Sequence, residues 1–256
     1  MKVSIITVVW NNADTIKDAI ESVLNQTYKN IEYIIIDGGS KDGTIEVIQS
    51  YGNKISKFIS EKDEGIYDAM NKGIKLATGD IVGILNSDDF YKSNDVIETV
   101  VREFISKDID CLYGDLEYVD KNDTSKVIRY WKSNPYKEGL FQKGWHPPHP
   151  TFFVKREIYY KYGMFNTNFK IAADYELMLR FLEKYKIKSS YIPKVLVRMR
   201  FGGASNRNLI NIIKANIECY KAWKVNNLSV NPISILIAKP FSKLLQYKFF
   251  ARNNVI

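Results

Sequence analysis

Apolar residues recur along the first part of the chain in two alternating patterns, one typical of buried strands and one of amphipathic helices. Runs without alternation, such as Val3–Val9 and Ile31–Ile36, predict strands that are buried on both faces. Over residues 16–24 apolar side chains return every three or four positions, which predicts a helix with a single apolar face. Asp14 precedes this helix and is expected to cap it.

The same alternation continues to about residue 113 and then changes. We predict helices at 43–51, 66–77 and 97–104, and strands at 55–59, 80–85 and 109–113. Strands that alternate with helices at this spacing form βαβ units, so we expect an α/β fold with a mainly parallel central sheet and flanking helices. The remainder predicts a hairpin over 118–131, strands at 151–154 and 189–200, and helices at 174–184 and 206–223.

The composition is that of an ordinary globular protein, with 256 residues, 45% of them hydrophobic and 26% charged. Two distant cysteines outside any CxxC spacing argue against a disulfide framework or a structural zinc site. The sequence has no apolar run of about 18 residues and no signal-peptide pattern at its N-terminus. We therefore expect neither a membrane span nor a secretory leader.

The net charge of +8 is concentrated near the C-terminus, where no acidic residue follows Glu218. Apolar residues of the last 25 positions share one helical face, although Pro240 would kink a continuous helix. A basic amphipathic segment predicts binding to an anionic membrane surface, with packing on the domain or a dimer contact as the alternative. We expect no nucleic-acid partner, because the basic residues alternate with bulky aliphatic ones and no recognition motif is present.

Carboxylates follow one predicted strand after another. Asp37 ends the second strand, Asp63 follows the third, and Asp88 and Asp89 end the fourth. Ligands of open parallel sheets bind outside the carboxyl ends of the strands. Clustered carboxylates repel one another unless a cation joins them, and oxygen ligands suit Mg²⁺ or Mn²⁺ shared with phosphates. The pattern predicts a metal–diphosphate site, although each motif alone is also typical of a strand-ending turn or a helix N-cap.

Several ordered motifs resemble those of family-2 glycosyltransferases of the GT-A fold. They are SIITVVWNN at 4–12, SVLNQTY at 22–28, IDGGSKDGT at 36–44, GIYDAMNKGI at 65–74 and NSDD at 86–89. The resemblance covers roughly residues 1–203. Within the family, the sequence is most similar to bacterial enzymes of capsule, O-antigen and exopolysaccharide assembly. It implies transfer of a sugar from a nucleotide-sugar donor, expected to be a UDP-sugar, to a glycan or a lipid-linked glycan.

The resemblance implies a donor site built from residues of the first half. Thr7 and Trp10 would line the nucleobase pocket, with Trp10 standing where the family usually has a tyrosine that stacks on the base. Asp37 would bond the base, Asp63 would lie beside the nucleoside, and Asp88 would contact the ribose region.

It also implies a metal ligand and a catalytic base. Asp89 would coordinate Mn²⁺ or Mg²⁺, and Asp174 would be the base, with Ala173 replacing the glutamate of the family's Glu-Asp motif. The residues alone allow Asp174 to be a plain helix N-cap, and Glu176 is the reserve candidate. His149 is a candidate on the acceptor side, with a loop histidine of no special role as the alternative.

The implied reaction is an inverting single displacement by a hexosyltransferase, in the cytoplasm and peripheral to the inner face of the cytoplasmic membrane. Residues 202–205 resemble a loop that closes over such sites, and Arg198 or Arg200 is placed to reach the diphosphate. We expect a glycosyltransferase domain at 1–205, with a nucleotide-sugar half at 1–115 and an acceptor and base half at 116–205, followed by a helical basic extension at 206–256.

Two other functions remain open on the residues alone. A nucleotidyltransferase acting on a sugar phosphate would be expected to carry a glycine-rich basic loop near the N-terminus, but residues 7–14 contain no Gly, Lys or Arg. A non-catalytic nucleotide-sugar-binding module would not need both Asp89 and Asp174.

Overall fold

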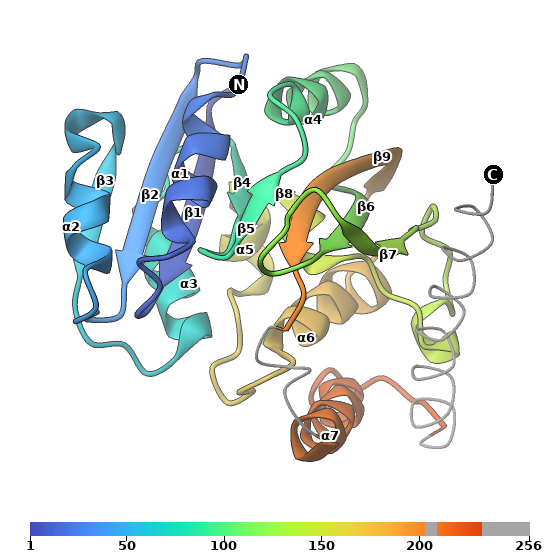
Figure 1. Ribbon diagram of the computed structural model, residues 1–256. Helices are drawn as coiled ribbons and strands as arrows, with labels where there is room; N and C mark the ends of the chain where they lie inside the picture. Colours follow the sequence, from blue (N-terminus) through green and yellow to red (C-terminus); the bar gives the residue numbers. More distant parts are fainter. Residues whose placement is uncertain (203–208, 232–256) are drawn as a thin grey trace.

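In the computed structural model, which describes residues 1–202 and 209–231, nine strands form one sheet (Figure 1). Their spatial order is β3-β2-β1-β4-β8-β6-β9-β5, and β7 pairs with β6 on one side of this path. The strands are β1 (Val3–Val9), β2 (Ile31–Asp37), β3 (Lys57–Ser60), β4 (Ile81–Ile84), β5 (Asp89–Tyr91), β6 (Cys111–Val119), β7 (Val127–Trp131), β8 (Phe153–Lys155) and β9 (Ser189–Arg200).

Helices flank the sheet, and none in the described part of the chain is long and apolar enough to cross a bilayer. They are α1 (Ile16–Leu24), α2 (Thr44–Gln49), α3 (Ile66–Leu76), α4 (Val96–Ser106), α5 (Arg156–Tyr162), α6 (Ala173–Leu179) and α7 (Leu209–Val225). Short helical turns are η1 (Gly52–Lys54), η2 (Phe141–Lys143), η3 (His149–Thr151) and the π-helical η4 (Arg180–Lys184).

The first half of the sheet explains the uninterrupted apolar runs. Strands β3, β2, β1 and β4 are parallel, and both faces of β1 and β2 are covered. Ile5 and Ile35 pack into one hydrophobic core, whereas Ile6 and Ile34 pack into a second core on the other face. A strand between two cores is buried on both faces and therefore shows no alternation of apolar and polar residues, so the predicted α/β fold with a central parallel sheet is confirmed here.

The second half of the sheet is mixed. β8 is antiparallel to β4 and β6, β9 is parallel to β6, and β5 is antiparallel to β9. The strand predicted at 109–113 and the first arm of the predicted hairpin are one strand, β6, which pairs with β7. Its register to β9 shifts beside Gly114, where an added Cβ would lie 2.6 Å from Leu196.

The structure adds local detail to the predicted elements and corrects one of them. α1 begins at Ile16 with Thr15 in the N-cap position, so Asp14 is not its cap. Two elements have no predicted counterpart: the helix α5 and the strand β5, which at three residues is too short to show a period. The helix predicted at 174–184 is α6, and it continues into a π-helical turn at Arg180.

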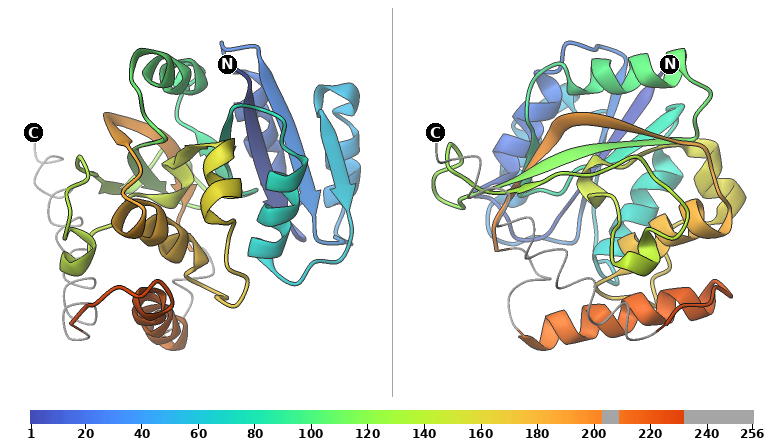
Figure 2. Two further views of the ribbon diagram at one scale, coloured as in Figure 1. Left: turned by 180° about the vertical axis from the view of Figure 1, so that it is seen from behind. Right: turned by 90° about the vertical axis from the view of Figure 1, so that its right-hand side faces the viewer.

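Helix α7 is built into the core of the second half, beside α6 (Figure 2). Cys219, Ala222 and Trp223 are buried, and Trp223 Nε1 donates to Tyr175 Oη at 3.0 Å. The predicted boundary near residue 205 places α7 in a separate extension, whereas in the structure α7 is part of the core of the second half. The predicted membrane-binding segment, residues 232–256, lies outside the described residues.

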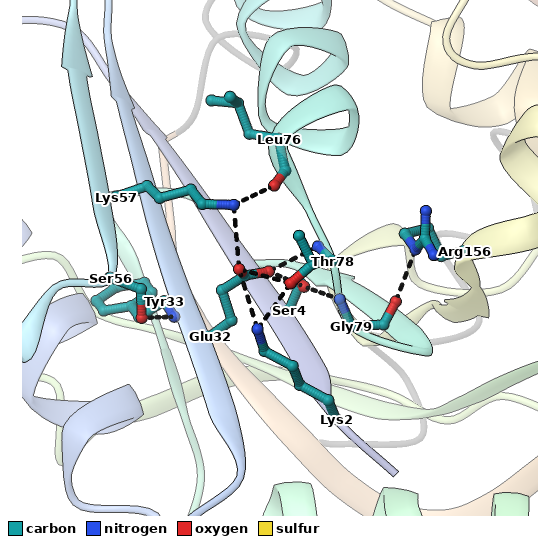
Figure 3. A network of polar contacts seen from close by, with 10 residues as sticks. All are labelled: Lys2, Ser4, Glu32, Tyr33, Ser56, Lys57, Leu76, Thr78, Gly79 and Arg156. Carbon is teal, nitrogen blue, oxygen red and sulfur yellow. Dashed lines mark hydrogen bonds and ion pairs between the residues drawn. The ribbon is translucent and has the colours of Figure 1, made fainter.

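A buried carboxylate ties together the amino-terminal edge of the parallel strands (Figure 3). Glu32 is 4% exposed and accepts hydrogen bonds from Ser4 Oγ at 2.6 Å and from Thr78 N and Oγ1 at 2.7 and 2.8 Å. The ammonium groups of Lys2 and Lys57 lie 3.2 and 3.1 Å from Glu32 Oε1. Burial alone would raise the pKa of Glu32, but the bonds from Ser4, Thr78 and Lys57 outweigh it and lower the pKa to about 2.

Replacing Glu32 with glutamine should lower the free energy of unfolding at pH 7 by about 2–3 kcal/mol, because hydrogen bonds to a charged group are lost. The lowered pKa means that this stabilisation is fully present above the usual value of 4.5 and is lost as the pH falls toward 2. Urea unfolding at pH 7 and pH 3 should therefore show a large difference from wild type that shrinks on acidification. Glu64→Gln, at an exposed position, is the control. Equal stability of Glu32→Gln and wild type at pH 7 would contradict the assignment.

Candidate active site

The loops that follow β1 and β2 are joined at the carboxyl edge of the sheet. Asn11 N donates to Ser40 Oγ at 2.7 Å, and Asn11 Oδ1 accepts from Lys41 N at 2.8 Å. Asn12 N donates to Thr44 Oγ1 at 2.8 Å. Asn11 has a φ of 48°, a left-handed conformation that asparagine tolerates better than most residues. The two loops therefore form a single, hydrogen-bonded surface.

Trp10, Gly38 and Asp63 meet on this surface. The Trp10 side chain is 67% exposed directly beyond β1. A Cβ on Gly38 would lie 2.6 Å from Asp63 Oδ2 and 3.5 Å from Trp10 Cβ, so the absence of a side chain lets the two residues approach the backbone. Asp63 Oδ1 accepts from Gly65 N at 3.0 Å. Trp10 and Asp63, two of the residues predicted to line the donor site, thus both lie beside Gly38.

Asp37 and Thr7 face the protein interior. Asp37 is fully buried, and its Oδ2 accepts from the main-chain N–H groups of residues 39 and 40, both at 3.0 Å, and from Ser60 Oγ at 2.7 Å. Thr7 is also fully buried, with Oγ1 3.0 Å from Tyr33 Oη. The carboxylate of Asp37 shapes the turn after β2, as the turn interpretation of this motif expects. The donor contacts implied for these two side chains stay predictions.

Asp89 is a buried carboxylate with one unpartnered oxygen. It is fully buried, its Oδ1 has no hydrogen-bond partner, and Oδ2 is 3.4 Å from Asn86 Nδ2. Burial, and secondly the charge of Asp88, raise the pKa of Asp89 well above its usual value. Within the described residues no cluster of three or more His, Cys, Asp or Glu side chains could hold a metal ion. The Asp88–Asp89 pair therefore fits a cation only if other ligands, such as phosphate oxygens, complete its shell.

The antiparallel pairing of β5 with β9 brings an arginine to this pair. Arg200 Nη1 donates to the carbonyl oxygen of Asp88 at 2.7 Å, and Nη2 donates to Asp18 on α1. Arg200 is 5% exposed, and its Nε is buried without a partner. Arg198, the other predicted candidate, instead donates from Nε to Glu117 at 2.9 Å. Arg200 therefore holds the main chain of the acidic motif, whereas Arg198 is paired elsewhere.

Ser87 connects the acidic motif to the loop after β1. Asn12 Nδ2 donates to Ser87 Oγ at 2.8 Å, and Thr15 Oγ1 donates to the carbonyl oxygen of Ser87 at 3.1 Å. The loops that carry Trp10 and Asp88 are thus parts of one network.

Asp174 stands at the start of α6 in contact with two residues from other parts of the chain. Its Oδ2 lies 3.1 Å from His149 Nδ1, and its Oδ1 lies 3.3 Å from Tyr67 Oη. The side chains of Asp174 and His149 are 21% and 29% exposed, so both can be reached from solvent. The structure therefore brings together the predicted base and the predicted acceptor-side histidine.

The sequence did not single out Tyr67 as a functional residue, although it lies within the GIYDAMNKGI motif. Its hydroxyl donates to the carbonyl oxygen of Ile171 at 2.8 Å, a shorter contact than the one to Asp174. Burial, and secondly the charge of Asp174, raise the pKa of Tyr67 well above its usual value. Tyr67 is thus a permanent hydrogen-bond donor beside the carboxylate.

Glu176, the reserve candidate for the base, is 2% exposed and fully paired. Its two oxygens accept from Arg180 Nε and Nη2 at 2.9 and 3.0 Å, and Oε1 also accepts from Asn226 Nδ2 at 2.8 Å. A carboxylate held in this way inside the core has no oxygen free for an incoming hydroxyl group.

Two further features lie apart from these groups. Of the predicted closing loop 202–205, only Gly202 falls within the described residues. A hollow lined by residues such as Gln26, Lys29 and Lys54 lies at the opposite, amino-terminal edge of the strands, away from the predicted site residues.

Comparison with known proteins identifies relatives along most of the chain. Residues 4–163 match the sequence profile described as glycosyl transferase family 2. An uncharacterised glycosyltransferase of Rickettsia typhi is 33% identical over 214 residues, which are 80% of this chain and 66% of that protein. A PGL/p-HBAD biosynthesis glycosyltransferase of Mycobacterium tuberculosis is 27% identical, over 79% of this chain and 78% of that protein. The chain spans between 42% and 66% of the length of three Rickettsia relatives.

Solved structures share the fold. The crystal structure of S. aureus TarS 1-349 in complex with UDP-GlcNAc has a TM-score of 0.69 and 16% identity, over 99% of this chain and 74% of that chain. The mannosyltransferase PcManGT from Pyrobaculum calidifontis, in complex with GDP-Man and Mn²⁺, has a TM-score of 0.65 and 17% identity, over 98% of this chain and 74% of that chain. The predicted GT-A fold is therefore confirmed.

Replacing Glu176 with glutamine should destabilise the protein without removing the catalytic group. The Arg180 guanidinium would lose its buried counter-charge, at a cost of about 3–5 kcal/mol. Chemical unfolding should show this loss, while turnover per folded molecule stays near that of wild type. Glu157→Gln, at an exposed position on α5, provides the control. A stable but inactive Glu176→Gln variant would show that Glu176, rather than Asp174, is the base.

Proposed function

The chain belongs to glycosyl transferase family 2, and from this premise we propose that it transfers a sugar from a UDP-sugar to a glycan or lipid-linked glycan by an inverting single displacement, with Asp174 as the base. The observation that carries the proposal is the contrast between two carboxylates. Asp89 is buried with an unpartnered oxygen, whereas Asp174 is partly exposed, with one oxygen beside His149 and the other beside Tyr67. Carboxylates in such different environments suit different roles in one reaction.

Asp174 acts on the acceptor hydroxyl group in this proposal. The hydroxyl oxygen attacks the anomeric carbon while its proton passes to an oxygen of Asp174, and the bond from that carbon to the diphosphate breaks. The bonding electrons leave with the nucleoside diphosphate, and attack from the opposite face inverts the anomeric centre. The Tyr67 hydroxyl group has a single proton, which it donates to the carbonyl oxygen of Ile171. The neighbouring Oδ1 of Asp174 can therefore accept a hydrogen bond from the hydroxyl group of the acceptor sugar. His149 orients the other carboxylate oxygen.

The donor would lie along the carboxyl edge of β1 and β2. The exposed face of Trp10 can stack on a nucleobase, and Asp63 offers an acceptor beside it. The solved structure of TarS contains UDP-GlcNAc, which supports a UDP-sugar donor and a hexosyltransferase reaction. The family match favours this reaction over the nucleotidyl transfer that the residues alone left open.

A divalent cation, Mn²⁺ or Mg²⁺, fits the Asp88–Asp89 pair on the evidence of the unpartnered Asp89 Oδ1. When bound, it would neutralise charge that develops on the departing diphosphate. Arg200 would keep the motif in place through the Asp88 carbonyl group. The Mn²⁺ in the PcManGT structure supports this assignment.

For the acceptor, we propose a surface polysaccharide precursor at the inner face of the cytoplasmic membrane. The support is the basic and apolar composition of residues 232–256, which suits an anionic lipid surface. A screen of UDP-sugars, including UDP-GlcNAc, with Mn²⁺ and read as UDP release tests the reaction itself. No release from any nucleotide sugar, with or without glycan acceptors, would contradict the proposed function.

Replacing Asp174 with asparagine keeps the shape of the side chain but removes its ability to take a proton. We expect kcat to fall about a hundredfold or more while the KM for the donor changes little. Steady-state UDP release measures both constants, with Asp108→Asn, at an exposed surface carboxylate, as the control. A normal kcat in Asp174→Asn would exclude Asp174 as the base.

Replacing Asp89 with asparagine should remove most turnover and also the response of the protein to Mn²⁺. A cation that binds only the folded state at a hundredfold excess over its Kd stabilises that state by about 2.7 kcal/mol. Mn²⁺ should therefore raise the Tm of wild type but not of Asp89→Asn, as measured by thermal unfolding with and without EDTA. Full activity of wild type in chelator, or an equal Tm shift in the variant, would contradict the metal assignment.

A further inference from the structure

A carboxylate from α7 holds the segment directly before α6. Glu218 Oε1 accepts from Lys170 N at 3.0 Å, and Oε2 accepts from Ile171 N at 2.9 Å and Ala172 N at 2.8 Å. One side chain thus binds three consecutive main-chain N–H groups that lie 46–48 residues earlier in the sequence. Hydrogen bonds to a charged acceptor are about twice as strong as neutral ones, so this is a firm attachment.

The held segment leads straight to the base. Ala172 is two residues before Asp174, and the carbonyl group of Ile171 accepts the hydrogen bond of Tyr67. Glu218 therefore fixes the N–H side of this segment, while Tyr67 fixes its C=O side and contacts Asp174.

Helix α7 has other contacts with α6 besides that of Glu218. Trp223, near the end of α7, donates to Tyr175, and Asn226, the residue after α7, donates to Glu176; both contacts are buried. Glu218 itself is only partly buried, at the rim of this interface. If it were absent, water could satisfy the three N–H groups, but water would not fix their position.

We propose that Glu218 is a positioning residue for the Asp174 base, an inference that rests on the proposed function. The carboxylate sets where α6 begins and so sets the position of Asp174 relative to His149 and Tyr67. Because a displacement of about 1 Å can lower a rate a hundredfold, even a slight shift of this segment costs turnover.

The test compares Glu218→Ala, Glu218→Gln and Asn226→Ala in the full chain. Glu218→Ala should lower kcat about 10- to 100-fold with an unchanged donor KM, and hydrogen exchange should speed up at residues 170–172. Glu218→Gln, which keeps one acceptor oxygen at the same reach, should lose less. Asn226→Ala removes a buried contact just after the end of α7 and should lower the Tm while kcat stays near wild type. Combined with Tyr67→Phe, Glu218→Ala should lose less than the product of the two single losses, because both residues hold one segment.

A normal kcat in Glu218→Ala beside an inactive Asp174→Asn would overturn this inference and leave the proposed function standing. The inference would also be overturned if kcat fell in proportion to the fall in Tm in both Glu218→Ala and Asn226→Ala. Glu218 would then affect turnover through stability alone. A wild type that releases no UDP from any donor would overturn the proposed function and this inference together.

Discussion

The position of β1 between two hydrophobic cores is the constraint on which the rest of the structure depends. The strand pairs in parallel with β2 on one side and β4 on the other, and neither of its faces meets water. All three strands therefore end at the same edge, and the loops that follow them must lie next to one another. The contacts of Asn11 with Ser40 and of Asn12 with Ser87 follow from this geometry. The proposed donor site therefore lies at an edge that the burial of the core creates.

Two separate sets of contacts bring residues of the second half of the chain to that edge. β9 pairs with β5 and brings Arg200 to the main chain of the acidic motif. The segment before α6 is held by Tyr67 from the first half and by Glu218 from α7, and it brings Asp174 against His149. The proposed metal ligand and the proposed base are therefore positioned by different contacts.

The sequence predicts the parts of the structure that depend on period and on strand order. Strands that are buried on both faces appear in the sequence as apolar runs. Carboxylates that directly follow such strands indicate a shared edge of the sheet, so the parallel half of the sheet and the acidic motif at 86–89 could be located. β5 could not, because three residues that begin with Asp89 carry no period. Tyr67 and Glu218 act through contacts that span 104 and 46–48 residues, and no local pattern encodes such partners. The buried pairing of Glu176 with Arg180 was missed because a first-turn glutamate is usually exposed.

The environments of three carboxylates decide what each can do. Glu176 has a full set of buried partners, which stabilises the ionised group and leaves it no free oxygen. Asp89 is equally buried but has one oxygen without a partner, so a bound cation would make its charge more favourable. Asp174 lies between these extremes, with two oriented oxygens and access to solvent. A base must meet its substrate before it can take a proton, and of the three only Asp174 combines fixed geometry with that access.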